Sequence, residues 1–320
     1  LVSYYGDLYF EKQSSISDEL KKTLKKENYP DRLPVKFEII EMSQLQNIEY
    51  AKARETEKRE NSSFFTGGEI IGGAIFKEKN AVSTSYRIKS RQFSNIYIPK
   101  DIELTKDNIE KYSPKLERIY KNINEGYKEK ISLVYSTFLD YGIKAFAKVL
   151  EFNNYKLYNP NEEFDSNFKY FALFSGDQTL EEKEDILKRL NLDENKYGKL
   201  ISILLISKSG VEGLDLKNVR SVHIIESYWN FSLIQQVIAR GVRYKSHTSL
   251  PEEERNVQTY IYLSDYNKDF LENEKNKLKE RQKKTSKKLD NIELTTDINM
   301  FKNCIKRQEL IYNFLKLIAS

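Results

Sequence analysis

Residues 200–216 read LISILLISKSGVEGLDL, and this stretch decides the fold. Its first half is almost entirely aliphatic, which is typical of a strand that is buried on both faces. The small and polar residues that follow, 207–215, predict a loop at the carboxyl end of that strand. Loops at this edge of a parallel sheet are where α/β proteins bind their ligands. The stretch therefore predicts a buried parallel strand that ends in a ligand-binding loop.

The same pattern of apolar strands and amphipathic helices continues on both sides of this stretch. We expect strands at residues 130–136, 170–175, 221–226 and 257–263, and helices at residues 141–152, 180–190 and 232–243. Such alternation indicates a parallel sheet with helices on both faces, because crossovers between parallel strands are right-handed. The predicted fold class is therefore α/β, a three-layer sandwich.

The flanking segments are less regular. Before the sheet region we expect a strand at residues 35–42, a charged helix at residues 43–60 with Ser43 as its N-cap, a flexible insertion at residues 61–81 and a helix at residues 114–127. Two more helices are expected at residues 265–288 and 297–318. We therefore divide the chain into a mixed N-terminal segment (1–129), an α/β domain (130–264) and a C-terminal helical extension (265–320).

Composition excludes several classes of protein. The chain has 320 residues and a net charge of +5, from 53 Lys and Arg against 48 Asp and Glu. Hydrophobic residues make up 39% of it, which is enough for a core and excludes a disordered chain. One cysteine and two histidines exclude an internal disulfide, predict no metal site and indicate a reducing, intracellular location. No apolar run approaches about 18 residues, so no membrane is expected as a partner.

Two motifs near the strongest strand suit a nucleotide. The loop glycines allow close approach to a phosphate, and Asp215 can accept a hydrogen bond from a ribose hydroxyl. Further on, Arg240 and Arg243 are three residues apart, so both project from one helical face, where two guanidinium groups suit a triphosphate. Taken singly, each motif has a plainer alternative: a turn with a capping Asp, or two solvated arginines on an amphipathic helix.

Together these motifs resemble a known family. Gly213-Leu214-Asp215, followed by Gln-x-x-x-Arg-x-x-Arg from Gln236, resembles motifs V and VI of superfamily 2 helicases, which lie in their second RecA-like domain. The segments ESYWN (226–230) and SHTSLPEEERNV (246–257) narrow the resemblance to the DEAD/Swi-Snf-like ATPases of nucleocytoplasmic large DNA viruses. That group includes the poxvirus early transcription factor small subunit and nucleoside triphosphate phosphohydrolase I. Residues 86–95 (YRIKSRQFSN) and the regions of motifs IV (134–138) and IVa (174–177) match as well.

The resemblance implies a RecA-like fold for residues 130–264 and a role for each matching residue. Gln236, Arg240 and Arg243 would act in catalysis, with Gln236 positioning motif VI and Arg243 serving as the arginine finger. Gly213 and Asp215 would face the nucleotide. Contacts with the nucleic-acid backbone, independent of base sequence, would come from Ser136, Thr137, Ser175, Gly176, Ser207 and Lys208.

The sequence contains no G-x-x-x-x-G-K-[ST] phosphate loop and no Asp-Glu box at the end of an apolar strand. We therefore expect the chain to be the C-terminal half of an ATP hydrolase or helicase of a large DNA virus, inactive alone. Residues 1–129 would join it to a missing first RecA-like domain, which would bind most of the ATP and Mg²⁺.

The expected partners are nucleic acid (DNA before RNA) and that first domain, and a viral RNA polymerase is a further candidate. The expected location is the virion or the host cytoplasm. The alternative is a non-catalytic RecA-like scaffold or nucleic-acid-binding module in a viral transcription complex. A small-molecule α/β enzyme is disfavoured, because the sequence shows neither a nucleophile–base pair nor a dinucleotide-type glycine fingerprint.

Overall fold

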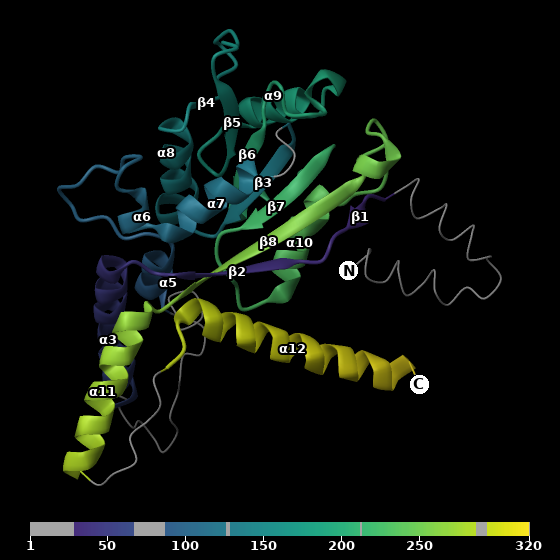
Figure 1. The fold of residues 1–320 in the computed structure, drawn as a ribbon. Helices are drawn as coiled ribbons and strands as arrows, with labels where there is room; N and C mark the ends of the chain where they lie inside the picture. Colours follow the sequence, from purple (N-terminus) through teal and green to yellow (C-terminus); the bar gives the residue numbers. More distant parts are fainter. Residues whose placement is uncertain (1–28, 67–86, 126–128, 212, 286–292, 320) are drawn as a thin grey trace, which may run out of the picture.

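The computed structural model describes residues 29–66, 87–125, 129–211, 213–285 and 293–319. Within these residues, an eight-stranded sheet has the order β1-β8-β7-β3-β6-β5-β4, with β2 also paired to β8 (Figure 1). The strands are Asp31–Arg32 (β1), Lys36–Glu41 (β2), Ile131–Ser136 (β3), Tyr155–Leu157 (β4), Lys169–Phe174 (β5), Ile203–Ser207 (β6), Val219–Ile224 (β7) and Asn256–Asp265 (β8). Every pair is parallel, which confirms the predicted sheet type.

Strand β3 lies between β6 and β7, and the register of the three strands brings their carboxyl ends together. Ser136 of β3 is opposite Ser207 of β6, and Tyr135 is opposite Ile224 of β7. All three strands are buried along their whole length. Burial of each large aliphatic side chain stabilises the sheet by about 1.5–3 kcal/mol. The loops that follow these strands therefore leave a well-packed core at one common edge.

Helices cover both faces of the sheet. The helices α7 (Pro114–Asn124) and α8 (Ala145–Glu151) pack on one face, and α9 (Leu180–Leu190) and α10 (Phe231–Gly241) pack on the other. Successive residues of β3 point to opposite faces. Leu133 belongs to the core with α9 and α10, whereas Val134 belongs to the core with α7 and α8. The predicted three-layer α/β sandwich is therefore confirmed.

Two segments near the carboxyl edge differ from the predictions. The helix expected from residue 141 begins earlier, as a wide π-helical turn at Leu139–Lys144 that continues into α8. A Cβ on Gly142 would lie 2.0 Å from Ser136 Oγ, so this turn passes the end of β3 too closely for any side chain. The strand expected at residues 221–226 is β7, Val219–Ile224, so Glu226 lies in the loop beyond it.

Some elements were not expected at all. β4 has only three residues, which is too short for a clear pattern. The helix α5 (Ile88–Asn95) was missed because its buried residues are polar: Ser90, Arg91, Ser94 and Asn95. A short helix, α6 (Ile109–Tyr112), precedes α7. Apolar periodicity cannot reveal a helix whose buried side chains are hydrogen-bonding groups.

The flanking segments pack against the sheet region. β2 pairs with β8 from Lys36–Tyr260 to Glu41–Asp265. The helix α3 (Gln44–Thr66) follows Ser43, whose hydroxyl accepts a hydrogen bond from Gln46 N at 3.1 Å, as expected of an N-cap. α3 includes residues 61–66, so the insertion predicted from residue 61 starts too early; its remainder, 67–81, lies outside the described residues.

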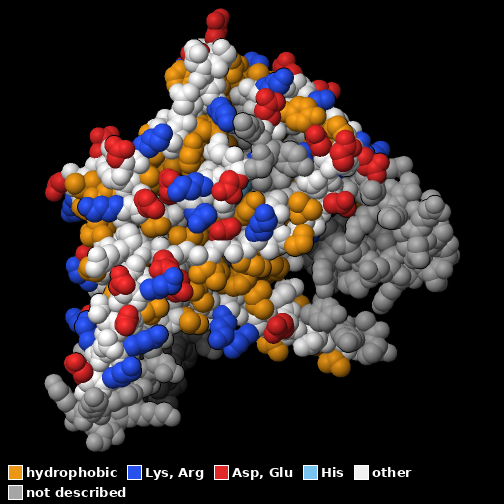
Figure 2. Space-filling view, in the orientation of Figure 1, with side chains coloured by type: hydrophobic (Ala, Val, Ile, Leu, Met, Phe, Trp, Pro, Cys, Tyr) orange, Lys and Arg blue, Asp and Glu red, His pale blue; other side chains and the backbone are white. Residues whose placement is uncertain are grey.

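The C-terminal extension forms α11 (Lys268–Thr285) and α12 (Thr296–Ala319), and α12 projects away from the sheet (Figure 1). Figure 2 shows Lys and Arg side chains interspersed with Asp and Glu over the visible face, with hydrophobic side chains gathered below β2. The exposed Phe37 of β2 has its ring centroid 5.0 Å from that of Phe301 on α12. Because charges of both signs are mixed on this face, it presents no broad basic surface.

Candidate functional site

The carboxyl edge of the sheet contains a hollow of about 710 Å³ lined by the loops after β3, β5 and β6. It is bordered by Thr137, Leu139, Ser175, Gly176, Asp177, Ser207, Lys208 and Ser209. Five of the six residues predicted to contact nucleic acid are therefore brought together, although they come from three separate loops. Ser136 does not line the hollow, because it is the last residue of β3 and is fully buried.

Most of the hydroxyl groups at this edge bond within the protein. The Ser136 and Thr137 hydroxyls both donate to the Glu226 carboxylate, at 2.9 and 2.7 Å. The Ser175 hydroxyl donates to Gln178 Oε1 at 2.9 Å. A phosphate oxygen only accepts hydrogen bonds, so a hydroxyl whose proton is already engaged has none to give it. These three hydroxyls therefore shape the edge rather than offer donors to a phosphate.

The donors that remain at the edge come mainly from the loop after β6. The Lys208 side chain is exposed, and its ammonium group lies 5.9 Å from the ring of Tyr228. The Ser207 and Ser209 hydroxyls share one hydrogen bond of 2.9 Å, so one of them retains a proton for another acceptor. Gly176 lies opposite Ser209, because a Cβ on Gly176 would stand 3.4 Å from Ser209 Oγ.

Glu226 is a buried carboxylate at the centre of this edge, and its role was not predicted. Besides the two hydroxyls, it accepts a hydrogen bond from Thr137 N and another from Asn95 Nδ2 at 2.9 Å. Burial, and then the nearby Glu226 carboxylate, raise the pKa of Tyr135. The buried charge is thus satisfied by hydrogen bonds from α5 and from the end of β3.

A second cluster forms where the loop containing Gly213 meets α10. Arg240 Nη1 and Arg243 Nη1 both donate to the carbonyl of Leu214, at 3.3 and 2.8 Å. Arg243 Nη1 also forms an ion pair of 2.8 Å with Asp215 Oδ1. Residues predicted to face the nucleotide and residues predicted to contact its phosphates are therefore neighbours in space.

The loop is held in this position by local features. Gly213 has a φ of +76°, a left-handed conformation that favours glycine. The Asn191 side chain, at the end of α9, donates to Asp215 O at 2.8 Å and accepts from Lys217 N at 2.9 Å. Gln236 is exposed on α10, one turn before Arg240, and the structure assigns it no hydrogen bond.

A buried ion pair joins the C-terminal extension to this edge. Lys115 Nζ lies 2.6 Å from Asp297 Oδ2, and each side chain is only 1% exposed. Lys115 also donates to Asn95 Oδ1 at 3.0 Å, so Asn95 links this pair to Glu226. The Ser227 hydroxyl donates to the carbonyl of Asp297 at 2.9 Å. One sequence signal for this network was the family resemblance of residues 86–95, to which no role was assigned.

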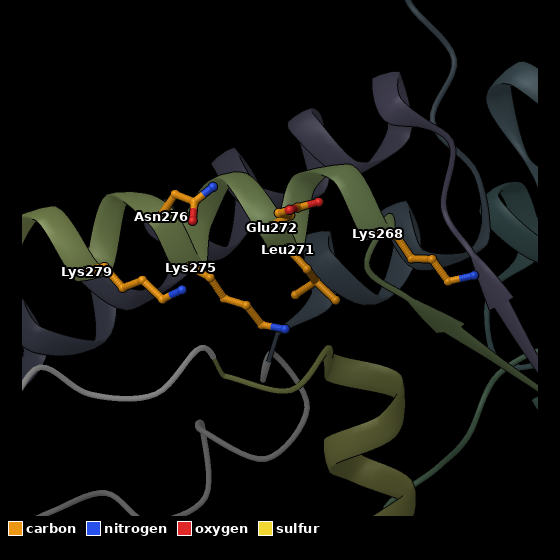
Figure 3. A pocket seen from close by; sticks show the side chains of 6 residues that line it. All are labelled: Lys268, Leu271, Glu272, Lys275, Asn276 and Lys279. Carbon is orange, nitrogen blue, oxygen red and sulfur yellow. The ribbon is translucent and has the colours of Figure 1, made fainter.

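A separate hollow of about 350 Å³ lies along α11, where Lys268, Lys275 and Lys279 extend from one side of the helix (Figure 3). Lys268 forms an ion pair of 2.8 Å with Glu41. Exposed lysines on one helix are common on solvated faces, so the candidate site is the sheet edge. No cluster of His, Cys, Asp or Glu suited to a metal ion occurs among the described residues, and none of their helices is long and apolar enough to cross a membrane.

This chain is similar to several known proteins. Residues 114–245 match the family model of the helicase conserved C-terminal domain. A protein of Acanthamoeba polyphaga mimivirus named as an ATP-dependent RNA helicase is 36% identical over 196 residues, which are 57% of this chain and 33% of that protein. The termination factor NPH-I homologue of African swine fever virus is 29% identical over 285 residues, 74% of this chain and 40% of that protein. A solved SWI2/SNF2 ATPase core from Sulfolobus solfataricus in complex with dsDNA covers 86% of this chain and 47% of its own, at 16% identity and a TM-score of 0.49.

The chain therefore contains a helicase C-terminal domain, the RecA-like module that carries motifs IV to VI. Its relatives include helicases and termination factor homologues of large DNA viruses, which is the group that the sequence resembles. The chain spans about a third to two fifths of the length of these two viral relatives.

Proposed function

We propose that this chain supplies the motif IV–VI half of a nucleic-acid-dependent ATPase or helicase of a large DNA virus. The observation that carries the proposal is the convergence of Arg240 and Arg243 on the carbonyl of Leu214. Two guanidinium groups held at one point stabilise the charge that develops on a transferring phosphoryl group. A scaffold has no need of this arrangement, so the non-catalytic alternative is not favoured.

Arg243 is the proposed arginine finger. Both of its side-chain hydrogen bonds use Nη1, so its Nε and Nη2 donors make no hydrogen bond to any described residue. Its partner Asp215 is 76% exposed and Arg243 itself 37%, so their ion pair contributes at most about 1 kcal/mol. A triphosphate can therefore displace Asp215 from Arg243 at small cost. Asp215 is then free to contact the ribose, and Gln236 would position the helix.

The remainder of the ATP site would lie on another RecA-like domain, which would hold most of the ATP and its Mg²⁺. The arginine cluster fits that division, because it supplies cationic donors to phosphates. When bound, Mg²⁺ neutralises charge on the phosphate oxygens. Residues 1–129 would connect the two domains.

Nucleic acid would bind along the hollow at the carboxyl edge, with Lys208 and the Ser207–Ser209 pair as donors to the backbone. The relatives are named as an RNA helicase and a termination factor, and we favour DNA as the substrate and a viral transcription complex with its RNA polymerase as the setting. The virion or the host cytoplasm is the proposed location.

ATP hydrolysis by the complete protein tests this function. We expect Arg243→Ala to lower kcat by about 10³-fold or more, because the developing charge loses its stabilising group. Arg255→Ala is the matched control: Arg255 donates to the carbonyls of Leu250 and Thr248, away from the motif V loop, and its loss should leave kcat near normal. The 320-residue chain alone should hydrolyse no ATP above background. Near-normal kcat in the Arg243 variant would refute the finger, and robust hydrolysis by this chain alone would refute the division of the site.

A further inference from the structure

Arg91 is a buried cation beside Thr137, a residue that lines the candidate nucleic-acid hollow. It comes from α5, is 6% exposed and donates from Nη2 to Thr137 Oγ1 at 3.2 Å. Its guanidinium group lies over the ring of Phe138 at 4.8 Å and near the ring of Tyr228 at 5.6 Å. These contacts hold the group in one place beside Thr137, which lines the hollow.

The charge of Arg91 is poorly satisfied within the part of the chain that the structure describes. Its side chain makes one hydrogen bond, to a neutral hydroxyl, and no ion pair. Arg91 Nε is enclosed without an acceptor. A buried guanidinium group is normally paired or hydrogen-bonded, because an unpaired buried charge is costly. The environment of Arg91 therefore calls for an anion that brings several acceptors.

Neighbouring groups indicate which anion this is. Lys208 lies 5.9 Å from the same Tyr228 ring that Arg91 approaches, so two cations meet at one aromatic side chain. Thr137 donates to Glu226 and accepts from Arg91, so its hydroxyl orients the guanidinium group rather than binding a phosphate. Successive phosphates of a nucleic-acid strand present anionic oxygens to both cations, and arginine binds such oxygens through two parallel hydrogen bonds.

We propose that Arg91 is an additional phosphate-contacting residue of the nucleic-acid site, positioned by Thr137 and Glu226. The proposal rests on the proposed function, because it assumes that the hollow holds a nucleic-acid backbone. It adds a residue from α5, outside motifs IV to VI, to the binding edge. In this proposal the Arg91 guanidinium group, and not the Thr137 hydroxyl, donates to the phosphate at this point of the hollow.

The salt dependence of DNA binding tests the proposal. Affinity of the chain for a fluorescently labelled DNA duplex is measured over a series of KCl concentrations, and the slope of log K against log [KCl] is compared between variants. Loss of one phosphate contact reduces the slope by about 0.9. We expect this reduction in Arg91→Gln and in Lys208→Gln. The buried Arg220 is the matched control, because it lies in β7, is paired with Glu254 at 3.4 Å and does not line the hollow. Arg220→Gln should keep the wild-type slope.

A conservative variant keeps the test decisive if Arg91→Gln fails to fold. Arg91→Lys should retain the slope, since the charge remains, but weaken binding several-fold at fixed salt, since the two-pronged contact is lost. A reduced slope in Lys208→Gln with unchanged binding by both Arg91 variants would overturn the role of Arg91 and leave the proposed function standing. Absence of any salt-dependent DNA binding by the wild-type chain would overturn both.

Discussion

Acidification should destabilise this protein because both of its histidines are buried. His247, in the loop after α10, is 2% exposed, with Nε2 2.8 Å from the carbonyl of Val219 and Nδ1 2.8 Å from the Ser246 hydroxyl. Burial lowers the pKa of His247 to about 4. The hydrogen bond to Val219 opposes this shift in part, and the positive charges of Arg220 and Arg255 add to it. A neutral imidazole is therefore built into the fold.

The size of the effect follows from this pKa. In the unfolded chain His247 takes up a proton near its ordinary pKa of 6.5, whereas the folded state resists until about pH 4. Above pH 6.5 the imidazole is neutral in both states and the shift has no effect on stability, whereas stability is lost as the pH falls from 6.5 toward 4, because only the unfolded state takes up the proton there. Between pH 7 and pH 5 the loss is about 2 kcal/mol, at 1.36 kcal/mol per pKa unit. Burial, and then Lys130, also lower the pKa of His223, so its contribution has the same sign.

Urea denaturation at pH 7, 6 and 5 measures the free energy of unfolding. The wild-type chain should lose stability across this range, and His247→Gln should lose about 2 kcal/mol less, because the substituted side chain cannot be protonated. His223 is present in both proteins, so its contribution cancels in the comparison. The reasoning is refuted if the wild-type chain and His247→Gln show the same pH dependence, whatever their absolute stabilities.

Two further substitutions test the packing that positions the site. Lys115→Met should reduce the free energy of unfolding by about 3–5 kcal/mol, because it leaves the Asp297 carboxylate buried without its counter-ion; a loss below about 1 kcal/mol in urea denaturation, the value for an exposed pair, would contradict this. Gly210→Ala should lower stability by about 1–3 kcal/mol, since its Cβ would stand 2.2 Å from the carbonyl oxygen of Phe174. Thermal denaturation checks the second effect, and an unchanged Tm would show that the loop after β6 can move aside.

Much of the fold could be predicted because its central strands are nearly uniform in hydrophobicity. β3, β5 and β6 were located to within about three residues, and the crossover helices were placed by their apolar periodicity. β4 and α5 escaped prediction for opposite reasons: β4 is too short to show a pattern, and the buried residues of α5 are polar. A method based on apolar spacing detects cores but does not detect buried hydrogen-bond networks.

The candidate site was predicted in part. The motif spacing predicted that Arg240 and Arg243 project from one helix, but α10 ends at Gly241, so Arg243 lies just beyond the helix. Both side chains nevertheless donate to the carbonyl of Leu214, in the loop between β6 and β7. The family resemblance predicted that Ser136 contacts the nucleic-acid backbone, whereas in the structure its hydroxyl donates to Glu226 inside the protein. Whether a hydroxyl at a strand end faces solvent depends on a residue 90 positions away, which local sequence cannot reveal.

The sequence by itself determined the class of fold and the resemblance to a family, because these depend on hydrophobic periodicity and on residue types at short, regular spacings. Only the tertiary structure decided which polar groups are available to a ligand. The Thr137 hydroxyl was predicted to contact nucleic acid. In the structure it donates to Glu226 and accepts a hydrogen bond from the Arg91 guanidinium group, and these three residues come from separate segments of the chain. The physical reason is that each donor can be used once, and which acceptor it meets is set by packing between distant elements.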